Sequence, residues 1–319
     1  MQNKKLKNQR IVFMGTSDFA AQILNKLIKN DLSPIAVCAK SVQNFTPVKE
    51  LINKSSKKKS IPLWEIENFS DKKYVKKLES LNIDLIIVAA FGVILPKSVL
   101  KLPVWGCINI HPSLLPKYRG PSPIQTAILN NDKTSGTTIM LLNDKMDAGD
   151  ILTQKKIKID KKYFYKQLEK ILAQISCDLL LKTLKDYLNG KILPKKQNHQ
   201  KATYTKLIKK ADGHIDWRKK ASEIEAKFRA YTPWPGIFTF FQSSKGGIRI
   251  QILDLNIIKK NFPQKPGTVI WRKKTAERPI VITKKGAIEL VKIKPQAKKE
   301  MDILEFINGH HSLVGSVLK

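Results

Sequence analysis

The segment Ile83–Leu95, IDLIIVAAFGVIL, is the longest apolar run in the chain of 319 residues. Asp84 and Gly92 interrupt it, and it is shorter than the roughly 20 apolar residues that a membrane-spanning helix needs. A short apolar run that is rich in Ile and Val is typical of a strand that is buried on both faces and leads into a loop. We therefore expect Ile83–Ala89 to be a strand of a parallel sheet.

Similar apolar strands lie on both sides of this segment and alternate with helical patterns. The other predicted strands are Ile11–Met14, Pro34–Ala39, Ile61–Trp64 and Gly106–Ile110. The predicted helices are a first one through Ala20, Leu24 and Leu27, a second from Pro47 into the basic run Lys54–Lys59, and a third over Asp71–Leu81. Ser17 or Asp18 is placed to cap the first helix. This order predicts an open α/β sheet, in which ligands bind beyond the carboxyl ends of the strands.

The pattern changes in the second half of the chain. Thr134–Leu142 and Ile151–Ile159 are predicted to be extended partners, followed by a long amphipathic helix over Phe164–Leu188 that stops at Asn189-Gly190. The next residues, 191–210, are polar, basic and without periodicity, as is typical of a linker.

The C-terminal part of the chain is rich in short β segments. A helix is predicted over Ala221–Tyr231, and the segments after it begin at Ile237, Ile248, Gly267, Pro279 and Ala287. Several short strands with turn signals between them favour a small barrel. We therefore predict a first domain over residues 1–190, a basic linker over residues 191–210 and a second domain over residues 211–319.

The chain is strongly basic. It carries 59 Lys and Arg against 26 Asp and Glu, which gives a formal net charge of +33. Such an excess attracts polyanions, and nucleic acid is the first partner to consider. However, 7 of these basic residues are Arg and 52 are Lys, and a genome that favours Lys, Ile and Asn codons explains the excess equally well. The charge permits nucleic acid as a partner without establishing it.

The cysteines favour a reducing compartment. Cys38, Cys107 and Cys177 are scattered and odd in number, and no pair has the C-x-x-C spacing of a zinc site. The basic N-terminus lacks the apolar core of a signal peptide. We therefore expect a cytoplasmic protein without structural disulfides.

The densest group of candidate catalytic residues is Asn109–Arg119, NIHPSLLPKYR, which leads into Gly120-Pro121. Asn109 and His111 alternate at the end of a predicted strand, so their side chains share a face where an active site of such a sheet belongs. His can give and take a proton near neutral pH, and an Asn amide can donate to a developing oxyanion. The other histidines are expected to be solvated or incidental: His199, His214, His310 and His311.

Three aspartates spaced by three residues follow in the segment NDKMDAGDIL: Asp144, Asp147 and Asp150. The spacing resembles a metal loop, but it lacks the Gly and the terminal Glu of an EF-hand. The segment is either a polar turn between two strands or the source of a carboxylate that orients His111, as in other acyl-transfer sites. Spacing alone does not select one of the three.

Two strings of this region are similar to the folate-dependent formyltransferases: INIHPSLLPKYRGPSPIQ at Ile108–Gln125 and SGTTIMLLNDKMDAGDIL at Ser135–Leu152. Three further stretches resemble the members of that family that act on methionyl-tRNA: IVFMGTSDFA near the start, ATYTKLIKKADGHIDW at Ala202–Trp217 and FRAYTPWPGIFTF at Phe228–Phe240. The resemblance covers nearly the whole chain. It implies a Rossmann-like formyltransferase domain with a mostly parallel sheet, followed by a smaller OB-like β-barrel.

The resemblance also implies a reaction and its residues. The implied donor is 10-formyltetrahydrofolate, and the implied acceptor is the methionine amine of initiator methionyl-tRNA, with no metal and with the enzyme as a monomer. The implied catalytic residues are Asn109, His111 and Asp147. The residues implied for folate binding are Ser113, Leu114, Leu115 and Pro116, with the pterin against Phe91, Gly92 and Val93.

One segment departs from the members that act on tRNA. Their second strand is followed by a longer basic loop with Gly and Arg that reaches the acceptor stem, whereas Cys38–Pro47 is short and carries one Lys. A formyltransferase for a small amine, such as a nucleotide-linked amino sugar, therefore stays an alternative. A third interpretation is a nucleic-acid-binding module with an inactive site, against which the retention of Asn109, His111 and Asp147 argues.

Overall fold

The computed structural model describes Leu6 and residues 8–41, 46–55, 61–243, 246–271 and 277–319. The chain divides into two compact units, the first made of residues 1–124, 133–159 and 167–207 and the second of residues 125–132, 160–166 and 208–319. Much of the short loop after the second strand and of the basic run at Lys54–Lys59 lies outside the described residues. No helix within the described ranges is long and apolar enough to cross a membrane.

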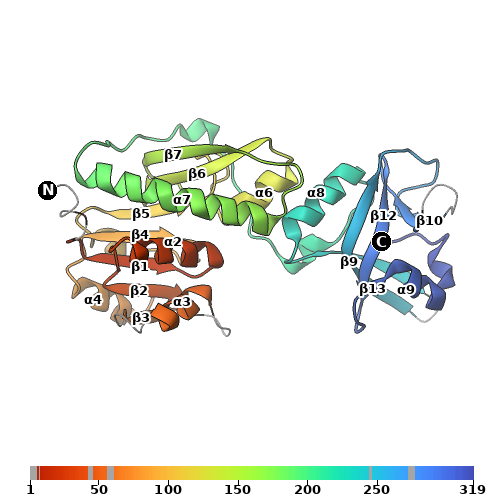
Figure 1. The fold of residues 1–319 in the computed structure, drawn as a ribbon, viewed down its shortest axis with the longest axis horizontal. Coiled ribbons are helices and arrows are strands. Elements are labelled where there is room, and N and C mark those ends of the chain that lie inside the picture. The colour runs from red at the N-terminus through yellow and green to blue at the C-terminus, as the bar shows by residue number, and fades with distance from the viewer. Residues whose placement is uncertain (1–5, 7, 42–45, 56–60, 244–245, 272–276) are drawn as a thin grey trace. The chain divides into compact units, whose positions relative to one another are not determined.

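The first unit is built on a seven-stranded sheet with the strand order β3-β2-β1-β4-β5-β6-β7 (Figure 1). The strands are β1 (Ile11–Gly15), β2 (Ala36–Lys40), β3 (Leu63–Ile66), β4 (Leu85–Ala89), β5 (Cys107–His111), β6 (Thr134–Leu141) and β7 (Ile151–Lys158). The first five are parallel, and β6 and β7 run antiparallel to their neighbours. The predicted mostly parallel α/β sheet is thus confirmed.

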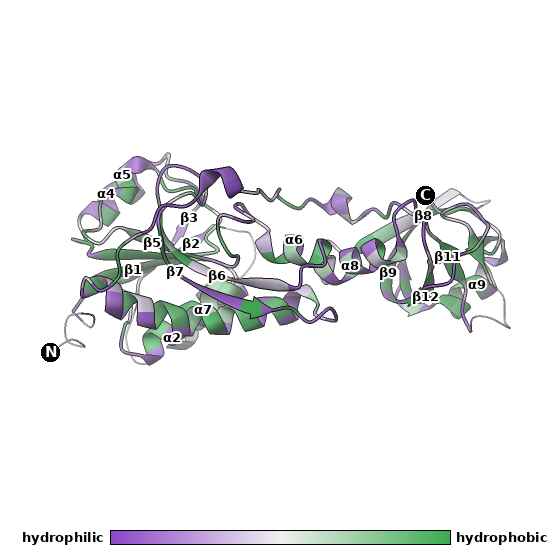
Figure 2. Ribbon diagram, turned by 90° about the horizontal axis from the view of Figure 1, so that it is seen from above, coloured by the Kyte–Doolittle hydropathy of each residue, from purple (hydrophilic) through white to green (hydrophobic). Residues whose placement is uncertain are grey.

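Helices cover both faces of this sheet, which is why its inner strands are continuous apolar runs. The helices of this unit are α2 (Asp18–Lys29), α3 (Pro47–Ser55), α4 (Lys72–Glu79), α5 (Lys97–Leu100) and α7 (Tyr165–Leu188), while most of α6 (Pro123–Leu129) belongs to the second unit. Figure 2 shows α2 and α7 on one side of the sheet and α4 and α5 on the other. Ser17 is the cap of α2, since its side chain accepts from the Ala20 N–H at 3.5 Å.

The second unit is built on an antiparallel sheet with the order β10-β11-β12-β9-β8, to which β13 pairs through β12. Its elements are α8 (Ala221–Tyr231), β8 (Ile237–Ser243), β9 (Gly246–Ile258), β10 (Val269–Ile270), β11 (Ile280–Ile282), β12 (Ala287–Pro295), β13 (Met301–Asp302) and α9 (Ile303–Gly309). The last residues of the chain join the two edge strands: Val269 of β10 donates to the Ser316 carbonyl at 2.9 Å, and Phe240 of β8 donates to the Lys319 carbonyl at 2.8 Å. These bonds close the sheet into the predicted small barrel. Among the described residues of both units there are also three short 3-10 helices: His199–Lys201, Lys210–Gly213 and His311–Leu313.

Much of the segment expected to be a linker packs against the first unit. The backbone of Lys195 exchanges two hydrogen bonds with Ile151 at the start of β7, at 2.8 and 2.9 Å. Farther along, the Arg119 N–H donates to the Thr203 carbonyl at 2.8 Å, and the Thr205 N–H donates to the Arg119 carbonyl at 2.7 Å. Residues 195–206, called here the docked segment, therefore continue the structure of the first unit.

Candidate active site

The end of β5 carries two of the predicted catalytic residues. Asn109 and His111 are 9% and 5% exposed, and as alternate residues of one strand they share a face of the sheet. β5 lies between the parallel β4 and the antiparallel β6, so its carboxyl end is where the direction of the strands changes. Polar side chains buried at this position need hydrogen-bond partners.

Asp147 reaches both of these side chains from the loop between β6 and β7. Its Oδ2 lies 3.6 Å from Nδ1 of His111, and its Oδ1 accepts from Nδ2 of Asn109 at 3.4 Å. The Gly120 N–H donates to the same carboxylate at 2.7 Å. The folded chain therefore brings Asn109, His111 and Asp147 together, although 38 positions separate Asn109 from Asp147.

The other two aspartates of the segment lie elsewhere. Asp144 forms an ion pair with Lys97 of α5 at 3.2 Å, and the hydrogen bond and charge of that lysine lower the pKa of Asp144. The backbone carbonyl of Asp150 accepts from the Leu141 N–H at 2.9 Å, where β6 meets β7. Within the described part of the chain, no three His, Cys, Asp or Glu side chains are grouped as metal ligands would be. The three aspartates therefore belong to a loop in which Asp147 alone has its carboxylate at His111.

Both ring nitrogens of His111 face protein atoms. Nε2 lies 2.8 Å from the backbone carbonyl of Tyr118, whose left-handed φ of +64° is unusual for a bulky residue. Because a carbonyl only accepts, Nε2 carries a hydrogen, and Nδ1 faces the carboxylate of Asp147. A second proton on Nδ1 would give an imidazolium that is held between Tyr118 and Asp147.

The predicted folate-binding turn, residues 113–116, is fixed to β6 by one hydroxyl group. Oγ1 of Thr138 accepts from the Leu115 N–H at 3.1 Å and donates to the Ser113 carbonyl at 2.7 Å. The amide of Gln154 on β7 adds a bond to the Leu115 carbonyl at 2.8 Å. The turn is therefore a rigid wall beside the end of β5.

The second predicted folate-binding loop, residues 91–93, follows β4, the strand that lies beside β1 at the point where the strand order reverses. Oγ1 of Thr16 donates to the Phe91 carbonyl at 3.0 Å and accepts from the Lys40 N–H at 2.9 Å. Gly92 has a φ of +76°, a conformation that favours glycine. Ligands of open α/β sheets bind at such a reversal of strand order, so this loop lies where a ligand is expected.

Sequence patterns did not predict a second group of polar residues behind Asp147. Gln197 is 5% exposed, and its amide Nε2 donates to the backbone carbonyls of Asp147 and Gly149 at 2.9 and 2.8 Å. Its Oε1 accepts from Nη2 of the buried Arg119 at 2.7 Å. His199, for which no role was predicted, accepts through Nδ1 from the same guanidinium at 2.9 Å. A linker without periodicity gives no signal for such contacts.

The three cysteines do not add a nucleophile to this site. All are buried, and burial raises the pKa of Cys38 and of Cys107 to about 12 and that of Cys177 to about 11. Thiols with such pKa values are almost fully protonated at neutral pH, and the thiolate is the reactive form.

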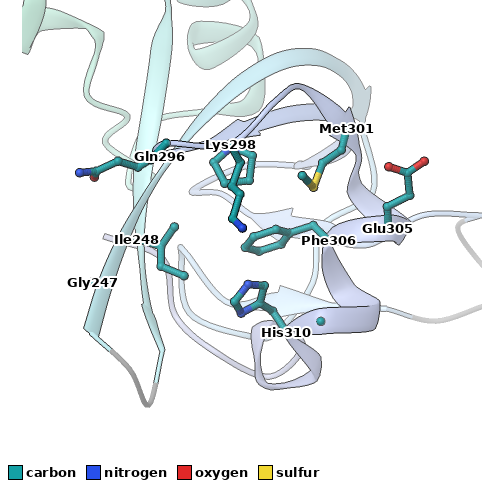
Figure 3. A pocket seen from close by; sticks show the side chains of 11 residues that line it. Gly247, Ile248, Gln296, Lys298, Met301, Glu305, Phe306 and His310 are labelled. Carbon is teal, nitrogen blue, oxygen red and sulfur yellow. The ribbon is translucent and has the colours of Figure 1, made fainter.

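A separate cavity of about 600 Å³ lies within the second unit (Figure 3). Phe306 and His310 line it, and their rings stack on each other with centroids 4.3 Å apart. Lys298 and Glu305 also line it. Its lining residues include none of the predicted catalytic residues, Asn109, His111 and Asp147, which lie in the first unit.

Comparison with known proteins identifies the family of the chain. The family model described as formyl transferase matches residues 9–184, and the model described as formyl transferase, C-terminal domain, matches residues 207–311. The chain therefore belongs to the formyl transferase family.

Within that family the chain groups with the methionyl-tRNA formyltransferases. The enzyme of that name from Caldanaerobacter subterraneus subsp. tengcongensis is 35% identical over 319 residues, covering 97% of this chain and all of the relative. The one from Chloroflexus aurantiacus is 36% identical, with 95% of this chain and 97% of the relative covered. A solved structure of an N-formyltransferase from Helicobacter canadensis, in complex with folinic acid and dTDP-3-aminofucose, has the same fold, with a TM-score of 0.63. It is 19% identical to this chain, and the match covers 88% of this chain and 99% of the Helicobacter chain.

Proposed function

We propose that the chain transfers the formyl group of 10-formyltetrahydrofolate to the amino group of methionine on initiator methionyl-tRNA. The observation that carries the proposal is the cluster of Asn109, His111 and Asp147 at the carboxyl end of the sheet, in a chain whose full-length relatives are methionyl-tRNA formyltransferases. The formal charge of +33 is compatible with a tRNA partner. The reaction belongs to the cytosol, where charged tRNA is used for translation.

In the proposed reaction the methionine amine attacks the formyl carbon, and negative charge develops on the formyl oxygen. Asn109 uses one amide N–H toward Asp147 and has a second that can donate to this oxygen. Protonated His111 supplies a positive charge at the same place, and its bond to the Tyr118 carbonyl fixes its ring. Fixed donors and charges of this kind stabilise an oxyanion without reorganisation during the reaction.

Asp147 has two proposed tasks. It faces Nδ1 of His111 and thereby holds the imidazolium. Its side chain is 15% exposed, so it can also accept the proton that the attacking amine loses. That proton goes to the departing folate nitrogen, directly or through water, as the bond between that nitrogen and the formyl carbon breaks. In the proposed reaction, Asn109, His111 and Asp147 are the side chains that act on the reacting atoms.

The proposed folate site consists of residues 113–116 and 91–93. Both segments are held rigidly at the carboxyl edge of the sheet, the first by Thr138 and the second by Thr16. Rigid backbone beside buried apolar side chains, among them Phe91 and Leu115, suits a flat pterin ring that needs a few fixed hydrogen bonds. The residues present therefore fit the donor.

The Thr16→Val variant is expected to bind tetrahydrofolate about fivefold more weakly, because the loop at residues 91–93 loses a hydrogen bond that contributes on the order of 1 kcal/mol. The dissociation constant can be measured by fluorescence titration. Thr232→Val, the same change in the second unit, serves as the control and should leave folate affinity unchanged. Equal affinity for Thr16→Val and the wild type would contradict the assignment of this loop to folate.

The proposed function is tested by transfer of radiolabelled formyl from 10-formyltetrahydrofolate to charged initiator and elongator methionyl-tRNA in parallel. We expect formylation of the initiator and little of the elongator. The result would also show that the short segment after β2 suffices for the acceptor end. Folate binding without transfer to either tRNA would refute the acceptor and would direct the search to nucleotide-linked amino sugars.

A further inference from the structure

The docked segment, residues 195–206, touches the proposed catalytic centre through one buried side chain. Gln197 donates both amide hydrogens to backbone carbonyls, at 2.9 Å to Asp147 and at 2.8 Å to Gly149. Its carbonyl oxygen accepts from Nε and Nη2 of Arg119 at 3.2 and 2.7 Å. Since a guanidinium only donates and a carbonyl only accepts, these partners fix which end of the amide is oxygen. Every hydrogen-bonding position of the amide is used.

The backbone that Gln197 holds is in an unfavourable conformation. Asp147 has a φ of +46°, in the left-handed region that costs free energy for a residue with a Cβ and persists only where its surroundings impose it. The two carbonyls bound by Gln197 lie at Asp147 itself and two residues beyond it. The amide therefore fixes the turn that directs the carboxylate toward Asn109 and His111.

A second connection runs from the docked segment to the carboxylate itself. Thr205 binds the Arg119 carbonyl through its N–H at 2.7 Å and through Oγ1 at 3.2 Å. A Cβ on the next residue, Gly120, would lie 2.8 Å from the Thr205 carbonyl oxygen and from its Oγ1, so the backbone at Gly120 packs closely against Thr205. The Gly120 N–H then donates to Oδ2 of Asp147 at 2.7 Å. Both the backbone and the side chain of Asp147 are thus positioned through this segment.

Arg119 makes the arrangement rigid. It is 2% exposed, and besides Gln197 its guanidinium contacts Nδ1 of His199 at 2.9 Å and the Tyr204 hydroxyl at 3.3 Å. All three partners come from the docked segment, and hydrogen bonds from a buried cation are stronger than neutral ones. The guanidinium therefore clamps the docked segment against the loop that begins at Gly120.

We infer that Gln197 is a positioning residue for formyl transfer, which orients Asp147 by binding the carbonyls of residues 147 and 149. The inference rests on the proposed function. It makes the docked segment part of the catalytic centre rather than a spacer. Gln197 itself needs no contact with either substrate, so its loss should change the rate of transfer and not the binding of folate.

The test compares Gln197→Leu and Gln197→Glu with the wild type. The leucine variant removes all four hydrogen bonds, while the glutamate variant still accepts from Arg119 but cannot donate to the two carbonyls. Because small displacements of a catalytic group can cost up to about a hundredfold, both variants should lose about tenfold to a hundredfold in kcat. The dissociation constant of tetrahydrofolate should stay within about twofold of the wild type. Gln200→Ala, which changes an exposed glutamine of the same segment, is the matched control and should keep the wild-type kcat.

A second measurement separates positioning from a general structural effect. In an Asp147→Asn background, adding Gln197→Leu should lower kcat by less than about a further twofold, because residues that act as one unit are not additive. Rates are expressed per folate-binding site, so that a variant that folds poorly still gives an interpretable kcat. A kcat of Gln197→Leu above half the wild-type value, or the full loss repeated in the Asp147→Asn background, would overturn the inference. A wild-type protein that binds folate but transfers no formyl group would instead refute the proposed function.

Discussion

Replacement of His111 by alanine is expected to lower kcat for formyl transfer on the order of a hundredfold to a thousandfold, the range seen when an oxyanion-stabilising group is removed. The imidazole is 5% exposed and is held between the Tyr118 carbonyl and the Asp147 carboxylate. In the proposed mechanism its removal takes away a group that stabilises the developing oxyanion, and it leaves the carboxylate of Asp147 without the imidazole that it faces. Binding of the two substrates should change much less than the chemical step.

The measurement is single-turnover transfer of formyl to initiator methionyl-tRNA with both substrates saturating. His311→Ala is the control, since it removes an exposed imidazole from the second unit and should leave kcat unchanged. Circular dichroism and folate titration establish that the His111→Ala protein is folded. A folded variant that keeps more than about a tenth of the wild-type rate would exclude His111 from the catalytic role, because the smallest expected loss is about a hundredfold.

The Gly149→Ala change is expected to have the largest effect on stability. A Cβ at this position would lie 1.8 Å from the carbonyl oxygen of Leu141, and the backbone of β6 must move to make room. Such a clash is expected to lower the free energy of unfolding by about 3 kcal/mol or more. For a folding unit of about 190 residues, the size of the first unit, the melting temperature should then fall by about 6–12 °C.

The same change should also lower kcat in the protein that remains folded. Gly149 lies two residues after Asp147, and its carbonyl accepts one of the two hydrogen bonds from Gln197. Gly309→Ala is the matched control, because a Cβ there has no neighbour within 4 Å, and its melting temperature should stay near that of the wild type. The melting temperatures of both variants can be measured by calorimetry. A melting temperature of Gly149→Ala equal to that of the wild type would contradict the close packing of this loop against β6.

The sequence by itself predicted the sheet and the end of it that carries the candidate site. Continuous apolar runs such as Leu85–Ala89 can be stable only where helices cover both faces, so they predict a mostly parallel sheet. The alternation of Asn109 and His111 places both on one face because successive side chains of a strand point in opposite directions. These are local properties of the backbone, and neighbouring residues are enough to reveal them.

The tertiary structure alone decided which residues complete the site. Spacing did not separate Asp144, Asp147 and Asp150, whereas in the fold the first pairs with Lys97 and the second faces His111. The resemblance to formyltransferases had indicated Asp147, but no local pattern did. Asp147 lies 38 positions after Asn109 in the sequence. The path of the loop between β6 and β7 is what brings its side chain to β5.

The same holds for Gln197 and for the closure of the barrel. Gln197 is one polar residue in a basic segment without periodicity, and only the pairing of Arg119 with residues 203 and 205 brings it beneath Asp147. Likewise, the chain end at Lys319 meets Phe240 across 79 positions. Hydrogen bonds between distant segments depend on how whole elements pack, and no regular spacing in the sequence records them. The hydrophobic periodicity of the sequence determines the helices and strands. The packing of these elements in the fold determines which of their polar residues form hydrogen bonds with each other.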